Sequence, residues 1–396
     1  MPVENVVIAG AGPAGLTAAT LLERAGVHVV VLEKSGTPAN KPCGGGLTPR
    51  ARMLLDEMDM PCVSGYDVPT VEANAPPWHY NTFTARGPLI RVVDRGEFNR
   101  SLWANAVARG VTILRRKVLG VSHGPGGFAV RTDDGVFHCD VVIGADGPTS
   151  RVLRSLGGRI HKHGGAYMYE RVETDRYAGR VVFDGRAEPP GYGWVFATGP
   201  DTVNAGIYLT HGSNGHSPKQ LLEDYARDRL GFVPDAPVVG GSIPWGGATL
   251  PEPAPPVLLA GDAGGFTDPM TGEGIYHALA TGRAAARACA AVGPAGVRRE
   301  FFRLTRFFRL NVAFLRWFCP TAYPHVAGGA RLLRLPLFHR VVTEGFLRGY
   351  TTSQCLARLP QLYWSSWRGQ YLAGHEHTAG MPLAAYSGRL NPVRGK

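Results

Sequence analysis

Residues 6–15 read VVIAGAGPAG, a short apolar run followed by a glycine-rich turn. The run is typical of a buried parallel strand, and apolar residues at helical spacing follow as far as Ala25. A second β-branched run ends at Glu33, 18 residues after Gly15. A strand, a glycine turn, a helix and a strand that ends in an acid form the dinucleotide-binding pattern. In that pattern the glycines let the backbone approach a pyrophosphate, and the acid accepts a hydrogen bond from a ribose hydroxyl.

Two later segments repeat the change from strand to turn to helix. One apolar run ends at Asp146 and the other at Asp262, and the second leads into GEGI at residues 272–275 before an Ala-rich helix. The first glycine turn does not distinguish NAD from FAD, so these segments carry that decision. A second interpretation stays open, because aspartates in such places also serve as simple helix N-caps.

The charge of the chain is concentrated at one end. The 396 residues carry 42 basic and 31 acidic side chains, and 44% of them are hydrophobic, which excludes a disordered or collagen-like chain. Residues 298–396 hold 15 basic and 3 acidic groups, whereas residues 1–297 hold 27 and 28. We therefore expect no nucleic-acid partner, and we expect a local patch for an anion or a membrane surface.

The cysteines and histidines do not suggest a metal. None of the six cysteines forms a C-x-x-C pair, and the histidines lack a ligand spacing with a partner acid, so we predict neither zinc nor a secreted disulfide framework. The chain starts directly with an apolar strand and has no apolar run of about 18 residues, so we expect neither a signal peptide nor a transmembrane helix. These features favour the cytoplasm, with peripheral contact at the inner membrane face.

The three glycine-containing segments, in this order, resemble the FAD-binding set of the para-hydroxybenzoate hydroxylase class of flavoproteins. The resemblance implies that Asp262 holds the ribityl chain and that the amides at Gly274 and Ile275 face the flavin C2 carbonyl. Arg95 matches a position that faces the FAD phosphates, although it also fits a solvated arginine at a helix start. The full cofactor-binding set that we predict is Gly10, Gly12, Ala14, Gly15, Glu33, Lys34, Gly44, Gly45, Arg95, Val118, Asp146, Asp262, Gly274 and Ile275.

Two further stretches resemble one branch of that class, the geranylgeranyl reductase family. Residues 41–50, KPCGGGLTPR, resemble its PCGxGL loop. Residues 191–196, GYGWVF, with NAG at 204–206, resemble its YxWxFPKG and VGxG signatures. The chain departs from the family at Ala197 and Thr198, which replace the expected Pro-Lys, so no role of that lysine transfers to this chain.

The resemblance implies an enzyme that saturates C=C bonds of an isoprenoid chain by hydride transfer from reduced flavin. Tyr192, Trp194 and Phe196 alternate along a strand, so they share one face and are suited to wall an apolar tunnel. We predict Cys43, Tyr192 and Trp194 as catalytic residues, and Tyr192, Trp194, Phe196 and Tyr208 as substrate contacts. The alternatives are an ordinary aromatic sheet face and an inert, buried Cys43.

Other functions remain open at this level. The main alternative is an FAD-dependent monooxygenase that hydroxylates or epoxidises an aromatic or terpenoid substrate; a flavin halogenase and an inactive lipid-binding protein are weaker ones. The electron donor is either NAD(P)H or a redox protein, since only one dinucleotide motif is present. The substrate is a prenyl diphosphate, a polar lipid or a prenylquinone, and the sequence leaves the oligomeric state open.

The predicted fold class is α/β, with a discontinuous Rossmann-like FAD-binding domain, an inserted antiparallel-sheet substrate domain and a helical C-terminal cap. The three domains comprise, in that order, residues 1–65, 88–157 and 257–292; residues 66–87 and 158–256; and residues 293–396. A helical wheel over 300–318 places Phe301, Leu304, Phe308, Val312 and Leu315 in one stripe and the arginines opposite or beside it. This pattern predicts one amphipathic helix, either with a solvated arginine face or with arginines that bind phosphate or anionic lipid.

Overall fold

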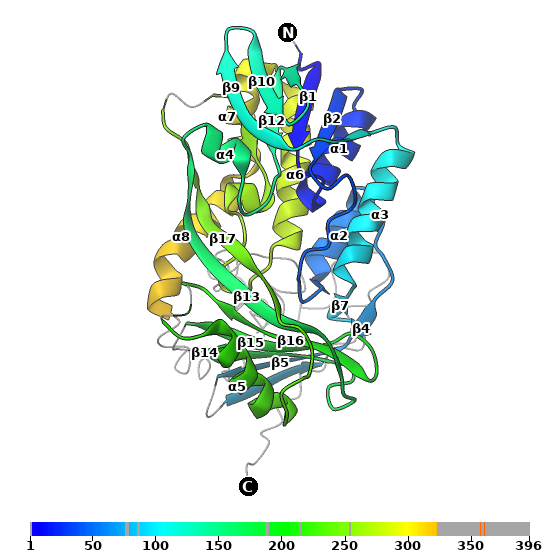
Figure 1. Ribbon diagram of the computed structural model, residues 1–396, viewed down its shortest axis with the longest axis vertical. Coiled ribbons are helices and arrows are strands. Elements are labelled where there is room, and N and C mark those ends of the chain that lie inside the picture. Colours follow the sequence, from blue (N-terminus) through cyan, green and yellow to red (C-terminus); the bar gives the residue numbers. More distant parts are fainter. Residues whose placement is uncertain are drawn as a thin grey trace.

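The computed structural model describes residues 2–75, 79–84, 88–186, 190–211, 213, 215–252 and 255–322, together with positions 357 and 360. Two sheets dominate the molecule, one in each half of the long axis (Figure 1). A five-stranded parallel sheet with its helices forms the upper half, and a seven-stranded sheet forms the lower half. This arrangement confirms the predicted fold class.

The parallel sheet contains the strand that opens the chain. Its order is β18-β12-β1-β2-β8, with bounds Leu258–Leu259, Val141–Gly144, Asn5–Ala9, His28–Glu33 and Thr112–Arg115. The central strands are buried on both faces, which explains why β1 and β12 are continuous apolar runs without alternation. Their carboxyl ends meet at one edge, where Gly10, Asp146 and Asp262 follow their strands.

Helices cover one face of the parallel sheet, and a small sheet covers the other. The helical side holds α1 (Pro13–Arg24), α2 (Pro49–Glu57), α3 (Arg95–Ala108) and α6 (Ile275–Ala291). The opposite side packs against β9, β10 and β11 (Val118–Gly124, Gly127–Thr132, Val136–Cys139) and against α4 (Arg151–Ser155). Val6 and Ile8 point to the helices, whereas Val7 and Ala9 point to the small sheet, as the strand period of two requires.

The seven-stranded sheet supplies the floor of the molecule. Its order is β17-β13-β16-β15-β14-β5-β6, with bounds Val239–Thr249, Arg159–Glu173, Thr202–Leu209, Gly191–Ala197, Arg180–Arg186, Thr70–Ala75 and His79–Thr84. Helix α5 (Pro218–Leu230) covers its outer face, and the inner face is turned toward the parallel-sheet half (Figure 1). The sheet is antiparallel except at β14 and β5, which pair in parallel.

Short elements join the two halves. Strands β3, β7 and β4 (Gly46–Leu47, Ile90–Val92, Tyr66–Val68) form a small antiparallel sheet beside the inner face. A short 3-10 helix, η1 (Gly261–Gly264), follows β18. The domain boundaries proposed from the sequence are not decided by these strands and stay predictions.

The expectation of a single helix over 300–318 is wrong. The chain forms α7 (Pro294–Leu304) and α8 (Arg306–Ala322), and Thr305 breaks the helix while its hydroxyl donates to the Phe301 carbonyl. The predicted apolar stripe does pack inward, since Phe301, Val312 and Leu315 are buried. The outward face of α8 is not purely charged, because it also carries Phe307, Leu310 and Trp317 at 50%, 63% and 69% exposure. The rest of the predicted cap, 323–396, lies outside the described residues except for positions 357 and 360.

Candidate active site

A cavity of about 990 Å³ lies between the two halves. Its walls come from the carboxyl edge of the parallel sheet, the 41–50 loop, the 267–275 loop and the inner face of the seven-stranded sheet. Of the predicted site residues, Gly15 does not line it; the residues that do are Gly10, Gly12, Ala14, Glu33, Lys34, Cys43, Gly44, Gly45, Arg95, Val118, Asp146, Tyr192, Trp194, Phe196, Tyr208, Asp262, Gly274 and Ile275. The structure therefore gathers residues from distant segments around one space.

The first glycine turn leaves room for a phosphate at the start of α1. Gly12 is the N-cap residue and makes no side-chain capping bond, and a Cβ on it would meet no atom within 4 Å. Gly10 has φ of 98°, and a Cβ there would lie 2.4 Å from the Ala145 carbonyl oxygen. The first glycine thus makes the turn, while the second leaves the helix N-terminus open to an anion.

The Glu33 carboxylate, at the end of β2, is held by hydrogen bonds from Ala11 in the glycine turn and from Ser35. Its Oε2 accepts from the Ala11 amide at 2.9 Å, and its Oε1 accepts from the Ser35 hydroxyl at 3.0 Å. The side chain is only 7% exposed and lines the cavity, so a carboxylate is held where a ribose would extend from the pyrophosphate position.

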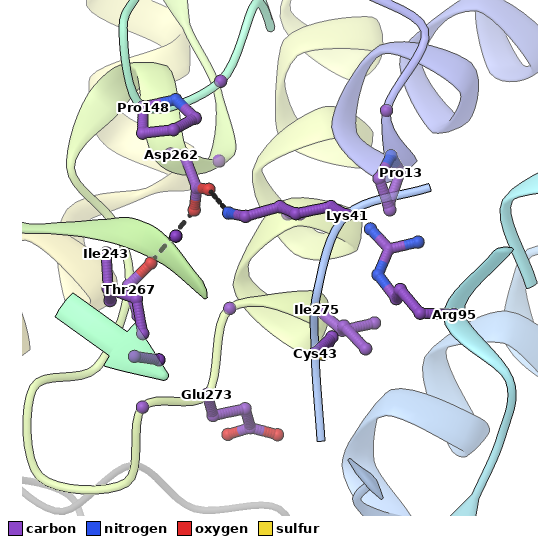
Figure 2. A pocket seen from close by; sticks show the side chains of 18 of the residues that line it. Pro13, Lys41, Cys43, Arg95, Pro148, Ile243, Asp262, Thr267, Glu273 and Ile275 are labelled. Carbon is purple, nitrogen blue, oxygen red and sulfur yellow. Dashed lines mark hydrogen bonds and ion pairs between the residues drawn. The ribbon is translucent and has the colours of Figure 1, made fainter. Parts of the chain in front are cut away.

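Asp262 joins the 41–50 loop to the 267–275 loop through its contacts with Lys41 and Thr267 (Figure 2). Its Oδ2 lies 2.5 Å from Lys41 Nζ, and its Oδ1 accepts from the Thr267 hydroxyl at 3.1 Å. The side chains of Lys41 and Asp262 are 37% and 19% exposed, so the pair is reached from the cavity. Asp262 is not a helix cap in the sense of the alternative interpretation, because it lies inside η1 and its two carboxylate oxygens face the side chains of Lys41 and Thr267.

Arg95 extends into the cavity from the first residue of α3 (Figure 2). Its guanidinium donates to Asn99 Oδ1, and Asn99 in turn donates to the Ala39 carbonyl. Burial lowers the pKa of Arg95, and the nearby Cys43 and Asp262 oppose that shift. A guanidinium stays charged in spite of such a shift, so Arg95 brings a fixed positive charge to the cavity.

Asp146 does act as a helix cap, as the alternative interpretation suggested. Its Oδ2 accepts from the amides of Arg151 and Val152 at 2.6 and 3.1 Å, at the start of α4. Its Oδ1 is buried without a partner, and burial raises the pKa of this carboxyl group. Asp146 also lines the cavity, so capping and contact with a ligand are compatible.

The 267–275 loop is held by charged residues that sequence reasoning did not single out. Glu273 accepts from the Thr48 hydroxyl at 2.5 Å and forms an ion pair with Arg50, and both charged side chains are about 10% exposed. Arg50 also stacks on the Tyr276 ring at 4.4 Å. Thr48 and Arg50 lie in the PCGxGL-like stretch and Glu273 lies in the GEGI stretch. Membership in these two motifs was the sequence signal that could have pointed to the contact between Glu273 and Arg50.

Aromatic side chains form the wall opposite this loop. Tyr192, Trp194 and Phe196 point from β15 to the same face, and Tyr208 of β16 packs 5.3 Å from the Tyr192 ring. The Tyr192 hydroxyl donates to the Thr271 carbonyl at 2.6 Å. Burial raises the pKa of both Tyr192 and Tyr208, so both phenols carry their proton at neutral pH. Most of the rest of this wall is apolar and includes Val71, Ala73, Met168, Phe183 and Ile243, with the polar Asn74 beside them.

Cys43 lies between the part of the cavity that holds Arg95 and the aromatic wall that holds Tyr192, and its sulfur influences the pKa of both side chains. It is half-buried, and its Sγ accepts from the Gly45 amide at 3.4 Å. The cysteines of the described chain that are classed as free are Cys43, Cys62, Cys139, Cys289 and Cys319, and of these Cys43 lines the cavity. The loop brings it within reach of a ligand, while its chemical role stays a prediction.

These residues fit an FAD molecule. The uncapped starts of α1 and α6 suit phosphate and a flavin carbonyl, Glu33 suits the ribose, and the partnerless Oδ1 of Asp146 marks a buried polar group without a protein contact. Within the residues that the structure describes, no group of three His, Cys, Asp or Glu is placed to hold a metal ion. No helix in the same part of the chain is long and apolar enough to cross a membrane.

Comparisons with known proteins agree with this geometry. Residues 4–178 match the FAD binding domain family. The chain is 33% identical to a menaquinone reductase of Mycolicibacterium smegmatis, over 71% of this chain and 75% of the relative. It is 30% identical to a geranylgeranyl diphosphate reductase of Rhodobacter capsulatus, over 72% and 75%. It is 31% identical to a digeranylgeranylglycerophospholipid reductase of Methanopyrus kandleri, over 71% and 79%.

Solved structures share the fold. A geranylgeranyl bacteriochlorophyll reductase-like protein of Thermoplasma acidophilum superposes with a TM-score of 0.72 at 21% identity, over 92% of this chain and 97% of the other. The flavin-dependent halogenase CmlS superposes with a TM-score of 0.67 at 19% identity, over 95% and 74%. At these identities the likeness concerns the fold alone.

Fold and site together define an FAD-dependent oxidoreductase, with FAD as its cofactor. Within that class, the identity to several named reductases over more than two thirds of their length decides the branch. The chain belongs to the geranylgeranyl reductase family.

Proposed function

We propose that this protein saturates C=C bonds of an isoprenoid chain, whose headgroup is a diphosphate, a polar lipid or a quinone. One observation carries the proposal: the cofactor cradle opens directly onto a wall of apolar and aromatic side chains within a single cavity. A wall of that kind recognises a long hydrocarbon by burial and shape and offers few hydrogen bonds. The names of the three relatives support the same substrate class.

The proposed roles follow from position. Gly10, Gly12, Ala14, Glu33 and Arg95 hold the nucleotide part of FAD, with Lys34, Val118 and Asp146 beside them, and Asp262, Gly274 and Ile275 hold the flavin part. When bound and reduced, the flavin supplies a hydride to one alkene carbon. Tyr192, Trp194, Phe196 and Tyr208 align the chain and exclude water.

The second alkene carbon needs a proton, and the loop provides a proton-bearing group. Cys43 lines the cavity between the cofactor cradle and the aromatic wall, which is where an acid is required. Glu273 is less suited to this role, since its carboxylate is engaged by Arg50 and Thr48. The Tyr192 hydroxyl is also engaged, since it donates a hydrogen bond to the Thr271 carbonyl. We assign Cys43 as the proposed proton donor from its place on the loop, and Tyr208, whose buried hydroxyl has no protein partner and which lines the same cavity, is the alternative.

The proposed function is tested by anaerobic turnover. The purified protein is reduced without oxygen and offered geranylgeranyl diphosphate, a geranylgeranylated glycerophospholipid and a menaquinone, and the products are weighed by mass spectrometry. A mass gain of about two units per turnover supports reduction, and for the menaquinone the gain is read in fragments of the isoprenoid chain, because reduction of the ring to the quinol adds the same mass. A gain of one oxygen in air, with all three substrates unsaturated as before, would show a monooxygenase instead.

We also propose that the protein is cytoplasmic and contacts the membrane surface peripherally through its Arg-rich C-terminal region. The observation behind this proposal is the outward face of α8, where exposed Phe307, Leu310 and Trp317 stand beside exposed Arg306 and Arg309, with exposed Arg303 near the end of α7. Aromatic and arginine side chains on one helix face are suited to the interface of an anionic bilayer. The inward face of α8 packs near Met270, which lines the cavity, so the same helix borders the proposed substrate site.

A further inference from the structure

Asn204 joins the substrate sheet to the glycine loop. It lies on β16 and is 3% exposed. The Trp194 indole Nε1 donates to Asn204 Oδ1 at 2.8 Å, and Asn204 Nδ2 donates to the Gly44 carbonyl at 2.9 Å. One amide therefore connects a strand of the aromatic wall to a loop that lies 160 residues earlier in the chain.

The surroundings of this amide leave little freedom. A Cβ on Gly44 would lie 3.0 Å from Phe196 Cε2, and a Cβ on Gly206 would lie 2.2 Å from Trp194 Cζ2. Gly45 has φ of 75°, and a Cβ there would lie 2.2 Å from the Val93 carbonyl oxygen. The loop thus sits in close contact with the aromatic wall, and the two hydrogen bonds of Asn204 fix it in that place.

A role in direct ligand contact does not fit Asn204. It is not among the residues that line the cavity, and both ends of its side-chain amide already have protein partners. Loss of the amide would leave the Trp194 N–H and the Gly44 carbonyl without partners in an apolar region. Because Cys43 directly precedes Gly44, that loss would also free the thiol from its position.

We propose that Asn204 is a positioning residue that sets the place of Cys43 and of the Gly44–Gly45 backbone against the flavin ring and the substrate. The inference rests on the proposed function and deepens it, since it assigns the contact that orients the proton donor. A shift of the loop by about 1 Å is expected to lower the turnover rate by about 10²-fold with little change in KM. FAD is expected to stay bound when it is supplied in excess, because the contacts at Glu33, Asp262 and the α1 start are not touched by Asn204 and only the Gly44–Gly45 side of the cofactor site moves.

The experiment compares three variants of the full-length holoprotein. Asn204→Asp keeps the acceptor for Trp194 but has no N–H for Gly44, and Asn204→Leu removes both bonds. Thr202→Val is the matched control, because it deletes a buried hydroxyl on the same strand that lies 3.1 Å from Thr198 Oγ1 and does not contact the loop. Each is measured for FAD content, for kcat and KM, and for the alkylation rate of Cys43 by peptide mass spectrometry at pH 8.

Cys139 and Cys289 serve as internal references for alkylation, since burial raises the pKa of each to about 12 and keeps them unreactive at pH 8. We expect Cys43 to react severalfold faster in both Asn204 variants than in the wild type and in Thr202→Val, with kcat reduced and FAD content equal. An unchanged alkylation rate and kcat in Asn204→Asp would overturn the proposal, and this isosteric variant decides the matter if Asn204→Leu does not fold.

The alkylation readout separates this inference from the proposed function. If wild-type protein reduces no isoprenoid, the proposed function fails. The contrast in Cys43 reactivity between Asn204→Asp and Thr202→Val would still show whether Asn204 positions the loop.

Discussion

Gly15 packs so closely against the turn before it that a Cβ atom added to Gly15 would lie 2.0 Å from the Gly10 carbonyl oxygen. A Cβ atom added to Gly12, three residues earlier, would have no other atom within 4 Å. The two glycines of one motif therefore have different physical reasons to be glycine. Gly15 lets α1 approach β1, and Gly12 leaves space for a ligand.

We predict opposite consequences for two alanine substitutions in this motif. Gly15→Ala forces α1 away from the turn and is expected to destabilise the protein by about 1–3 kcal/mol, as overpacking does in other cores. Gly12→Ala is expected to leave the free energy of unfolding nearly unchanged without added flavin but to weaken FAD binding. Urea unfolding and flavin titration measure both effects. Equal loss of stability in the two variants would contradict this assignment.

Asp262 is predicted to control FAD retention. Asp262→Ala removes the acceptor that faces Lys41 and Thr267, so the variant is expected to purify with a lower ratio of flavin to protein absorbance. Asp262→Asn keeps one oxygen acceptor and is expected to retain an intermediate amount. Asp224→Ala, which breaks an exposed pair with Arg227 on α5, is the control and should bind FAD as the wild type does. Full FAD content in Asp262→Ala would refute the assignment.

His277 is predicted to make stability depend on pH. It is 1% exposed, its Nε2 has no partner, and burial followed by the Arg50 charge holds its pKa well below the usual range, with Asp268 opposing. The folded protein then keeps His277 neutral while the unfolded chain binds a proton below about pH 6.5. Its contribution to stability is present above that pH and is lost as the pH falls, by about 1.4 kcal/mol per unit.

The measurement is urea unfolding at pH 7 and pH 5 in buffer saturated with FAD. Wild-type protein is expected to lose about 2 kcal/mol from this residue between pH 6.5 and pH 5, and His277→Leu is expected to lose less over the same interval. His216→Leu, at an exposed position, is the matched control. Identical pH dependence in His277→Leu and the wild type would rule out His277 as the titrating group.

The outward face of α8 is predicted to bind anionic vesicles. Gln at Arg306 and Arg309 of α8 and at Arg303 near the end of α7 removes three charges and is expected to weaken vesicle binding by about 10²-fold, at about 1 kcal/mol for each arginine. Ser at Phe307, Leu310 and Trp317 is expected to weaken binding as well, with less dependence of the loss on salt.

Cosedimentation with vesicles of anionic or neutral lipid checks this prediction. Phe232→Ser, which changes an exposed aromatic residue outside α8, is the control. Retained binding in both triple variants would mean that this face is solvated or is covered by protein.

The sequence anticipated many of the residues that line the cavity but fewer of the contacts between them. Glycine turns after apolar strands are local patterns, so Gly10, Gly12, Glu33 and Asp262 were identified without coordinates, and all line the cavity. Gly15 was grouped with the binding residues but packs against the Gly10 carbonyl and does not line the cavity, because a motif does not say which of its glycines faces the cavity. The sequence analysis also missed that α8 carries apolar side chains on two faces, one buried and one exposed. A helical wheel shows the period of apolar residues but does not show which face packs against the rest of the protein.

The sequence by itself determined the class of protein, because buried strands and the glycine turns that follow them are recognisable from short stretches of consecutive residues and from the order of those stretches. Only the tertiary structure decided the contacts that join those stretches. Lys41 meets Asp262 across 221 residues, and Asn204 meets Gly44 across 160, and neither pairing leaves a periodic trace in the sequence. Such contacts arise when separately folded segments pack together, so the placement of Cys43 against the aromatic wall is a property of the assembled fold.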